Sequence, residues 1–351
     1  MSQWMEYLKT AVVEEASDVF FVAGKAACMK KDGHLVPLSN IRLMPADTEA
    51  MVTGLFEAAG RDMTAFLSSG DADFSFPVPG LARFRVNTYR QRGSWAAVIR
   101  IVSFDIPDWK AIRIPEAVMD LSKTESGLIL FTGTAGSGKT TTQACLIDRI
   151  NHTRDCHIVT LEDPIEYLHR HNRSIVSQRE ISIDTKDYLC ALRACVRQAP
   201  DVILLGEMRD PETMHTAMAA AETGHLVIAT LHTRGAVNAI DRIIDSFPSI
   251  QQGQIRLQLA TVLKTVVSQQ LMPDKNGSLV PVCEILQATS AVRSMIRDNK
   301  THQIPAAMAA GAREGMITMD QAIAKLYKAG HITKEAALHH ADKPESLERM
   351  L

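Results

Sequence analysis

Residues Gly133 to Thr140 read Gly-Thr-Ala-Gly-Ser-Gly-Lys-Thr and fit the spacing G-x-x-x-x-G-K-[ST]. Glycines at these positions let successive backbone N–H groups curl around a phosphate chain, and the N-terminus of a following helix adds partial positive charge. Lys139 is expected to reach the β- and γ-phosphates, and the Thr140 hydroxyl is expected to ligate Mg²⁺. The predicted nucleotide contacts of this loop are Gly133, Thr134, Ala135, Gly136, Ser137, Gly138, Lys139, Thr140 and Thr141.

The segments on either side of this phosphate loop provide the context that the motif requires. Residues 127–132 form a short apolar run typical of a buried strand, and residues 141–150 follow with the pattern of a helix. The alternative is a glycine-rich loop that binds nothing, and the order of strand, loop and helix argues against it. The sequence therefore predicts a nucleotide-binding protein.

Acidic residues and a histidine follow three further predicted strands, which lie at 157–161, 202–205 and 225–230. Glu162 to Glu166 follow the first strand, Glu207 the second and His232 the third. Ligands of open α/β sheets bind at the carboxyl ends of the strands. Phosphoryl transfer to water needs one carboxylate to hold Mg²⁺ or its waters and another to orient or deprotonate the attacking water. Each residue alone could cap a helix or lie in a solvated loop, but together with the phosphate loop they favour ATP hydrolysis.

Two arginines are predicted to face each other nearer the N-terminus. Residues 83–89 alternate with a period of two, and residues 96–102 can return antiparallel to them. A turn between Arg92 and Gly93 would pair Arg85 directly with Arg100, so that both project from one face of the sheet. Opposed like charges are unfavourable unless an anion lies near them. The alternative is a pair of solvated surface arginines.

The remaining pattern predicts an α/β protein of two domains. Residues 1–104 have the pattern of a small α+β domain, with a hairpin turn at 31–34, and residues 105–115 resemble a linker because they contain two prolines and no period. Residues 116–351 alternate apolar strands with helices, which indicates a parallel sheet covered on both faces. These helices are predicted at 140–150, 186–197, 211–223 and 236–245. From about residue 250 the pattern is mainly helical, interrupted by 278–282.

The composition narrows the range of functions. The chain has 351 residues, 46% of them hydrophobic and 22% charged, as in ordinary globular proteins. A net charge of −2 and an aromatic content of 5% argue against a nucleic-acid partner, because single-strand binders need a basic groove with stacking rings. The six cysteines form no C-x-x-C pair, so we expect reduced thiols and no zinc module. Without an apolar run of membrane-spanning length or a signal peptide, the protein is expected to stay in the cytosol without membrane insertion.

Four stretches of the chain resemble the signature boxes of secretion and pilus ATPases. They lie in order at 132–142, 162–166, 201–213 and 221–233. Within that superfamily the chain is most similar to the type IV pilus retraction, or twitching-motility, ATPases, which residues 82–87 and 291–297 also resemble. Pilus-assembly ATPases usually carry an additional N-terminal domain and a four-cysteine metal module. Neither is found here, which favours retraction over assembly.

The resemblance implies a homohexameric ring in which a PAS-like N-terminal domain is joined to a RecA-like P-loop motor domain. It implies that Glu166 activates water and that Glu207 supports Mg²⁺. It also identifies several residues that lie near nucleotide or subunit contacts in the family. These are Arg85, Arg100, Arg193, Arg197, Arg209, His232 and His225, the last two in a histidine box.

The implied function is a motor that hydrolyses ATP to retract type IV pilus subunits through an inner-membrane platform protein. Such a motor would be cytoplasmic and peripherally associated with the inner face of the membrane. A related secretion motor, as in type IVB secretion, is the main alternative, followed by a nucleic-acid translocase and by a non-hydrolysing nucleotide sensor.

In the segment 291–297, Val292, Met295 and Ile296 form one apolar stripe. Arg293 and Arg297 lie on a neighbouring face, and the resemblance implies that this helix couples hydrolysis to retraction.

Overall fold

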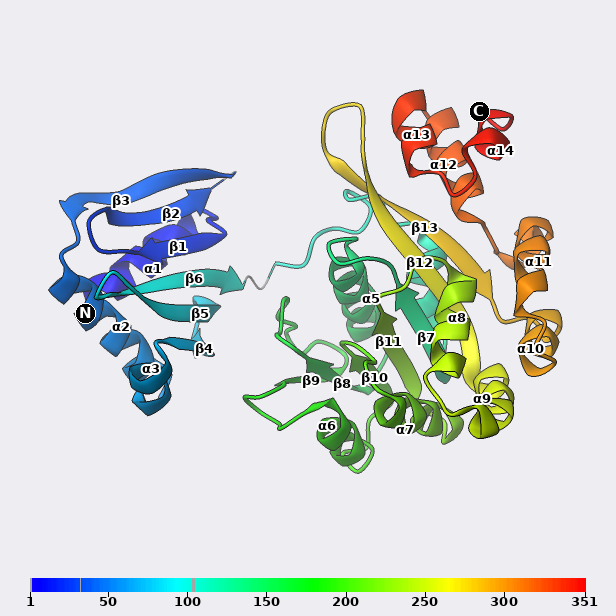
Figure 1. The fold of residues 1–351 in the computed structure, drawn as a ribbon, viewed down its shortest axis with the longest axis horizontal. Coiled ribbons are helices and arrows are strands. Elements are labelled where there is room, and N and C mark those ends of the chain that lie inside the picture. Colours follow the sequence, from blue (N-terminus) through cyan, green and yellow to red (C-terminus); the bar gives the residue numbers. More distant parts are fainter. Residues whose placement is uncertain (1, 32, 103–104) are drawn as a thin grey trace. The chain divides into compact units, whose positions relative to one another are not determined.

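The computed structural model describes residues 2–31, 33–102 and 105–351. The chain divides into two compact units, Met1–Asp105 with Glu166–Leu168, and Ile106–Ile165 with His169–Leu351 (Figure 1). The predicted domain end at residue 104 lies outside the described residues, as does Asp32 of the predicted hairpin turn.

The N-terminal unit is an antiparallel sheet backed by helices. Within the described part of this unit, the strand order is β3-β2-β1-β6-β5-β4. Trp4 and Leu8 of α1 and Val52 and Leu55 of α2 share one buried core with the sheet residue Phe84. The elements are α1 (Gln3–Val13), β1 (Asp18–Phe21), β2 (Ala26–Lys31), β3 (His34–Arg42), α2 (Pro45–Ala58), α3 (Thr64–Ser69), β4 (Asp71–Val78), β5 (Ala82–Gln91) and β6 (Ser94–Val102).

The predicted register of β5 and β6 is confirmed. Arg85 is the direct partner of Arg100, and the strands are joined at Arg92 and Gly93, whose φ angles are 49° and 78°. Positive φ at both central residues is what a tight two-residue hairpin turn requires. Phe84 is fully buried while Arg85 is exposed, so the strand presents its arginine on the face opposite the core.

The second unit is built on a sheet in which every neighbouring pair is parallel except β12 and β13. Among the described residues, the strand order is β13-β12-β7-β11-β10-β8-β9. Its elements up to the last strand are α4 (Glu116–Met119), β7 (Gly127–Thr132), α5 (Lys139–Thr153), β8 (His157–Glu162), β9 (Ile175–Glu180), α6 (Tyr188–Cys195), β10 (Val202–Leu205), α7 (Pro211–Glu222), β11 (Leu226–Leu231), α8 (Ala236–Asp245), α9 (Ser249–Val262), β12 (Leu263–Pro273) and β13 (Leu279–Gln287).

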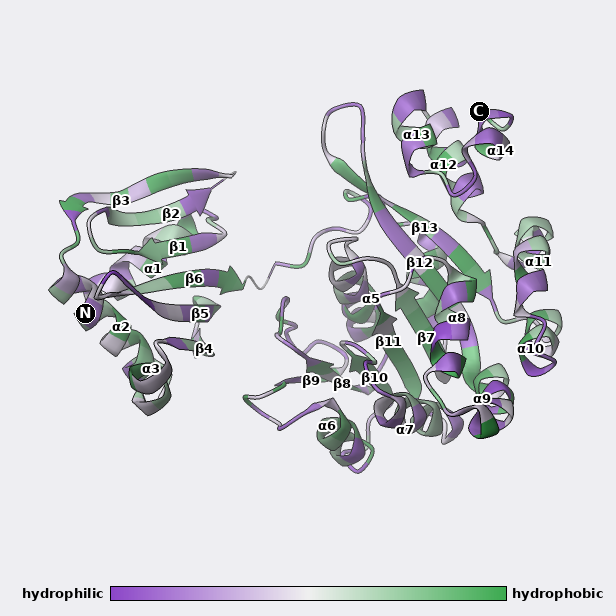
Figure 2. Cartoon of the chain, in the orientation of Figure 1, coloured by the Kyte–Doolittle hydropathy of each residue, from purple (hydrophilic) through white to green (hydrophobic). Residues whose placement is uncertain are grey.

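Helices cover both faces of this sheet, as its continuous apolar strands predict. Leu128 and Leu130 of β7 face a core shared with α6 to α10, whereas Ile129 and Phe131 face a core shared with α4 and α5. The central strands β7 and β11 are accordingly hydrophobic along their length (Figure 2). Burial on both faces removes the alternation expected of a half-exposed strand. The α/β fold class is thus confirmed.

Two strands depart from the predicted pattern. Residues 175–180 form the edge strand β9, and residues 263–273 form the long strand β12 directly after α9. The prediction of a mainly helical region from about 250 is therefore wrong for β12, which pairs with β7 in the middle of the sheet. Its sequence Ser268-Gln269-Gln270 interrupts the apolar run, although Ser268 and Gln269 are buried. A strand that contains buried polar residues is therefore not predicted from the hydrophobicity of its sequence.

The C-terminal part is helical, with α10 (Ser290–Arg297), α11 (Ile304–Ala310), α12 (Met319–Lys328), α13 (Lys334–His340) and α14 (Pro344–Glu348). Ile323 of α12, Ala337 of α13 and Leu347 of α14 pack with Met272 and Val280 at the outer ends of β12 and β13. These last three helices thereby lie against the strand that passes the phosphate loop. Among the described residues, the structure has no helix with the length and hydrophobicity needed to cross a membrane.

Candidate nucleotide site

The phosphate loop connects the end of β7 to the start of α5, as its motif predicts. Thr134, Ala135 and Gly136 at its tip are exposed, while Ser137 and Lys139 are buried. Gly133 has a φ of 142°, which glycine adopts without the strain of a side chain. Helix α5 begins at Lys139 and carries Thr140 in its first turn. The loop N–H groups therefore stand at the positive end of a helix, where an anion is stabilised.

Lys139 folds back over this loop. Its Nζ donates to the carbonyl oxygens of Gly133 and Thr134, each at 2.8 Å, and lies 3.4 Å from the Ser137 hydroxyl. Its side chain is buried, with 6% of its surface exposed. The ammonium group is thus held at the loop, where it can donate a hydrogen bond to a phosphate oxygen.

Glu207, His232 and Arg209 meet at the carboxyl edge of the sheet. Glu207 follows β10 and His232 follows β11, which are neighbouring parallel strands. His232 Nε2 lies 3.0 Å from Glu207 Oε2, and the Arg209 guanidinium pairs with the other oxygen of the same carboxylate. The pKa of His232 is lowered, first by burial and then by the positive charges of Lys139 and Arg209. A neutral imidazole that donates from Nε2 fits this arrangement, because an ionised carboxylate only accepts.

The two glutamates of the acidic segment after β8 differ in their exposure to solvent. Glu162 is buried and accepts from the Thr160 hydroxyl at 2.5 Å and from Gln178 Nε2 at 3.2 Å. Those partners fix Glu162 in the fold. Glu166 lies four residues further along the chain and is exposed. Of the two carboxylates, Glu166 is the one that solvent reaches, which fits its predicted role better than it fits that of Glu162.

Three further predicted nucleotide contacts lie outside the phosphate loop, two of them on or just after α6. His225 precedes β11, so a strand about 20 Å long separates it from His232. Its Nδ1 lies 2.9 Å from the carbonyl oxygen of Ala220. Arg193 pairs with Glu212 at 3.6 Å on the exposed surface of α6 and α7, and Arg197 is exposed beyond the end of α6. His225 therefore lies at the edge of the sheet opposite the phosphate loop, because the two ends of a strand lie at opposite edges, whereas Arg193 and Arg197 stand on the surface of α6 and just beyond its end.

The pair Arg85 and Arg100 belongs to the N-terminal unit, where an anion already stands beside one member. Asp18 of β1 is the strand partner of Arg100, and Arg100 Nε donates to Asp18 Oδ1 at 3.1 Å. No pattern in the sequence indicated that this carboxylate would face Arg100. It stabilises Arg100 without any ligand.

Two buried glutamines support the loop and were also missed. Gln143 of α5 exchanges hydrogen bonds with Thr230 of β11, at 2.9 and 3.2 Å. Gln269 of β12 donates from Nε2 to the Ser137 carbonyl oxygen at 2.8 Å and accepts from the Thr142 hydroxyl at 2.9 Å. Gln269 had no signal in the sequence, because its strand was not predicted.

Comparisons with known proteins agree with this geometry. The family model described as Type II/IV secretion system protein matches residues 2–349. The chain is 39% identical over 351 residues to the type IV pilus ATPase PilU of Pseudomonas aeruginosa, covering 99% of this chain and 91% of that protein. It is 38% identical over 342 residues to the type IV pilus retraction ATPase PilT of the same organism, covering 97% and 98%. A crystal structure of the pilus retraction motor PilT with bound ADP matches with a TM-score of 0.90 and 43% identity, covering 99% of both chains.

The chain belongs to the type II/IV secretion system protein family. The sequence-based identification as a pilus-retraction type of secretion ATPase is confirmed by these matches, which cover almost the whole chain. The bound ADP of the structural relative is consistent with a nucleotide at the phosphate loop.

Proposed function

We propose that this protein is an ATPase motor that powers type IV pilus retraction and twitching motility. The observation that carries the proposal is the likeness to retraction motors over almost the whole chain, together with an intact phosphate loop beside the Glu207–His232 pair. A non-hydrolysing nucleotide sensor is disfavoured, because Glu166 and Glu207 are both present.

Each residue of the loop edge has a role in the proposed hydrolysis. The N–H groups of residues 134–140 and the Lys139 ammonium group hold the phosphate chain. Glu166 accepts a proton from the attacking water or orients it. His232 holds the Glu207 carboxylate from one side and Arg209 holds it from the other, so its oxygens keep a fixed direction.

The donor set at this edge fits a magnesium ion that arrives with ATP. Among the described residues, no group of three or more His, Cys, Asp or Glu side chains could hold a metal alone. Thr140 offers a hydroxyl and Glu207 a carboxylate, and these hard oxygen donors suit a cation whose other ligands are phosphates and waters. Bound Mg²⁺ would neutralise charge that develops on the β- and γ-phosphates.

The arginines away from the loop are assigned to contacts between subunits of a homohexameric ring. Arg193 and Arg197 are exposed on their own chain, which leaves both within reach of a nucleotide bound by a neighbour. Arg85 and Arg100 project from one face of the N-terminal sheet and are proposed to neutralise the γ-phosphoryl group when that unit meets a motor unit. His225 is left out of the site, since its strand carries it to the opposite edge.

The proposed place of work is the cytoplasmic face of the inner membrane, where the ring would act on a platform protein of the pilus machinery. A sibling motor of a secretion machine is the second candidate, because the four boxes are shared across the superfamily. The net charge of −2 gives no support to a nucleic-acid translocase.

Deleting the gene in its host tests the cellular function. The expected result is excess surface pili and loss of twitching, because pili still assemble but are not withdrawn. Complementation with the wild-type gene should restore both, whereas a Lys139→Ala gene should not. Cells without surface pili after deletion would identify an assembly motor, and unchanged pili and motility would favour the secretion candidate.

A further inference from the structure

Gln269 lies beneath the phosphate loop, on the strand next to the one that feeds it. Strand β12 runs parallel to β7, with Ser268 paired to Thr132, so Gln269 stands level with the first residue of the loop. Only 2% of the surface of Gln269 is exposed to solvent. A buried primary amide costs free energy unless its donor and acceptor both find partners.

The Gln269 amide bridges the loop and the helix that follows it. Nε2 donates to the carbonyl oxygen of Ser137 at 2.8 Å, and Oε1 accepts from the Thr142 hydroxyl at 2.9 Å. Glutamine and asparagine carry both a donor and an acceptor on one planar group, and only glutamine has this reach. The amide therefore fixes the last turn of the loop relative to the first turn of α5.

The loop also comes close to the backbone and side chain of Gln269 at its glycines. A Cβ at Gly133 would lie 2.3 Å from the Gln269 carbonyl oxygen, and a Cβ at Gly138 would lie 2.9 Å from Gln269 Nε2. The loop thus lies against Gln269 at its first residue, at Ser137 and at Gly138. Both glycines are needed for this contact as well as for the backbone conformation of the loop.

We propose that Gln269 is a positioning residue for the phosphate loop. It holds the loop N–H groups in the shape that receives a phosphate chain, so its loss weakens nucleotide binding more than the chemical step. The inference rests on the proposed ATP binding by this site, and it adds a residue from β12 that touches the loop and no reacting atom. Loop N–H groups that are already in position bind an anion without the entropy loss of first ordering the loop.

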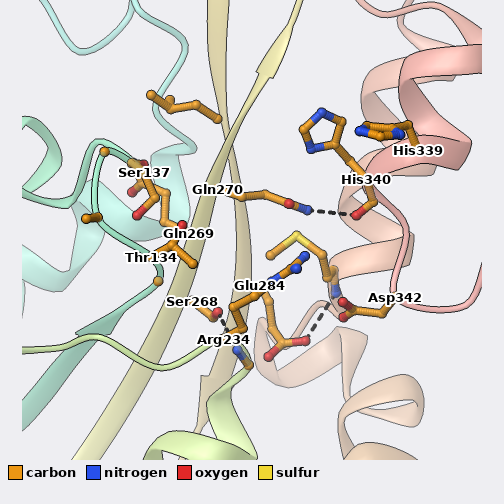
Figure 3. A pocket seen from close by; sticks show the side chains of 16 residues that line it. Thr134, Ser137, Arg234, Ser268, Gln269, Gln270, Glu284, His339, His340 and Asp342 are labelled. Carbon is orange, nitrogen blue, oxygen red and sulfur yellow. Dashed lines mark hydrogen bonds between the residues drawn. The ribbon is translucent and has the colours of Figure 1, made fainter.

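The next residue provides a matched control. Gln270 has the same side chain on the same strand but points away from the loop, and its Nε2 donates to the His340 carbonyl oxygen at 3.1 Å (Figure 3). The cavity of about 330 Å³ that Gln270 lines is also lined by residues 133–137 of the loop and by His339 and His340 at the end of α13. Loss of the Gln270 amide therefore removes one hydrogen bond from the same strand without touching the loop.

The test compares Gln269→Met with Gln270→Met in the full chain. Methionine keeps the length of the side chain and removes both hydrogen-bonding groups. We expect Gln269→Met to raise the Kd for a fluorescent ADP and the KM for ATP by about tenfold or more, with kcat within about threefold of wild type. Gln270→Met should match wild type in all three constants. The melting temperature without nucleotide should fall further for Gln269→Met, which loses two buried hydrogen bonds, than for Gln270→Met, which loses one.

A Gln269→Met protein that folds and binds ADP within about twofold of wild type would overturn the proposal. Equal losses of affinity in both variants would also overturn it, since they would indicate a general effect of strand β12. Thr142→Val removes the nearer donor to Oε1 and leaves the Cys283 thiol at 3.7 Å, so it should raise the Kd by about threefold, with less than additive effect in the double variant. If Gln269→Met does not fold, Thr142→Val decides, and unchanged affinity counts against the proposal. Wild-type protein that fails to bind ADP would instead refute the proposed function.

Discussion

Arg100 and Asp18 form an ion pair across neighbouring strands of the N-terminal sheet, with Arg100 Nε 3.1 Å from Asp18 Oδ1. The Asp18 side chain is 11% exposed and the Arg100 side chain 65% exposed. The Asp18 carboxylate is therefore packed within the N-terminal unit, whereas most of the Arg100 side chain is exposed to solvent. Arg85, directly opposite Arg100 in β5, is also exposed. One arginine of the pair has a partner within its own unit, and both remain accessible to a further anion.

Arg85→Ala and Arg100→Ala are each expected to lower ATP turnover by about tenfold or more, because each removes a charge that neutralises the γ-phosphoryl group. The melting temperature of both variants should stay close to wild type. Steady-state phosphate release by assembled rings provides the measurement. Normal hydrolysis by both variants would leave the pair as solvated surface arginines.

Asp18→Asn is the control for the ion pair. Because the Arg100 end of this pair is largely in solvent, the pair contributes about 1 kcal/mol or less to the free energy of unfolding. The substitution frees Arg100 without removing it, so turnover should remain within about twofold of wild type. If Asp18→Asn and Arg100→Ala lower turnover equally, the role of Arg100 is to hold β1 against β6.

Lys139→Ala and Glu166→Gln are predicted to fail in different ways. Lys139→Ala removes a charged contact to the phosphates and should weaken binding of both ATP and ADP. Glu166→Gln keeps the shape of the side chain but removes its basicity, so ATP should bind and remain unhydrolysed. Nucleotide binding and phosphate release, measured on the same preparations, separate the two outcomes.

Glu162→Gln serves as the comparison for Glu166→Gln. Glu162 is buried between Thr160 and Gln178, so its loss should lower the melting temperature rather than trap ATP. Near-normal turnover of Glu166→Gln, together with ATP trapping by Glu162→Gln, would move the water-activating role to Glu162.

The parts of the site that the sequence predicts well are those with a local pattern. The phosphate loop is set by its own glycines and by the apolar strand before it. The facing of Arg85 and Arg100 follows from alternation on two strands and a turn at Arg92 and Gly93, which together fix the register. Both predictions needed only residues close to one another in the chain.

The parts that were missed depend on contacts distant in sequence. Gln269 lies 132 positions along the chain from Ser137, whose carbonyl oxygen it binds. Hydrogen bonds offset the cost of burying its amide in β12, and no hydrophobic periodicity in the sequence indicates such bonds. His225 shares a sequence box with His232, but the whole of β11 separates them. Proximity in the chain misled the prediction there, because an extended strand carries its ends apart.

Arg293 has a structural role that changes the interpretation of the segment 291–297. The predicted helix is present as α10, and its stripe residues Val292 and Ile296 are fully buried. The Arg293 guanidinium donates to the carbonyl oxygens of Ala288, Ala260, Thr261 and Leu263, at 2.7 to 2.8 Å. Ala260 and Thr261 stand in the last turn of α9 and Leu263 is its C-cap, where carbonyl groups lack helical partners. Arg293 is therefore a cap for the C-terminus of α9.

Arg293→Ala is accordingly expected to lower the free energy of unfolding by about 2 kcal/mol, since charged hydrogen bonds to four backbone carbonyls, most of them partly buried, are lost. Arg293→Lys should recover only part of this, because one ammonium group cannot reach carbonyls on several sides. Arg297 is exposed and contacts only Ser294 and Asp298 among the described residues, so Arg297→Ala should change stability by less than about 0.5 kcal/mol. Urea denaturation of the three variants gives these differences.

Arg297→Ala thus becomes the clean test of coupling between hydrolysis and movement. With α9 and α10 intact, the variant should assemble and hydrolyse ATP as wild type does. If α10 transmits work to the pilus machinery through its exposed face, cells carrying this variant should resemble the deletion strain, with excess pili and no twitching. Normal twitching would remove Arg297 from the coupling surface. A loss of stability equal to that of Arg293→Ala would show that the face holding Arg297 also serves the fold.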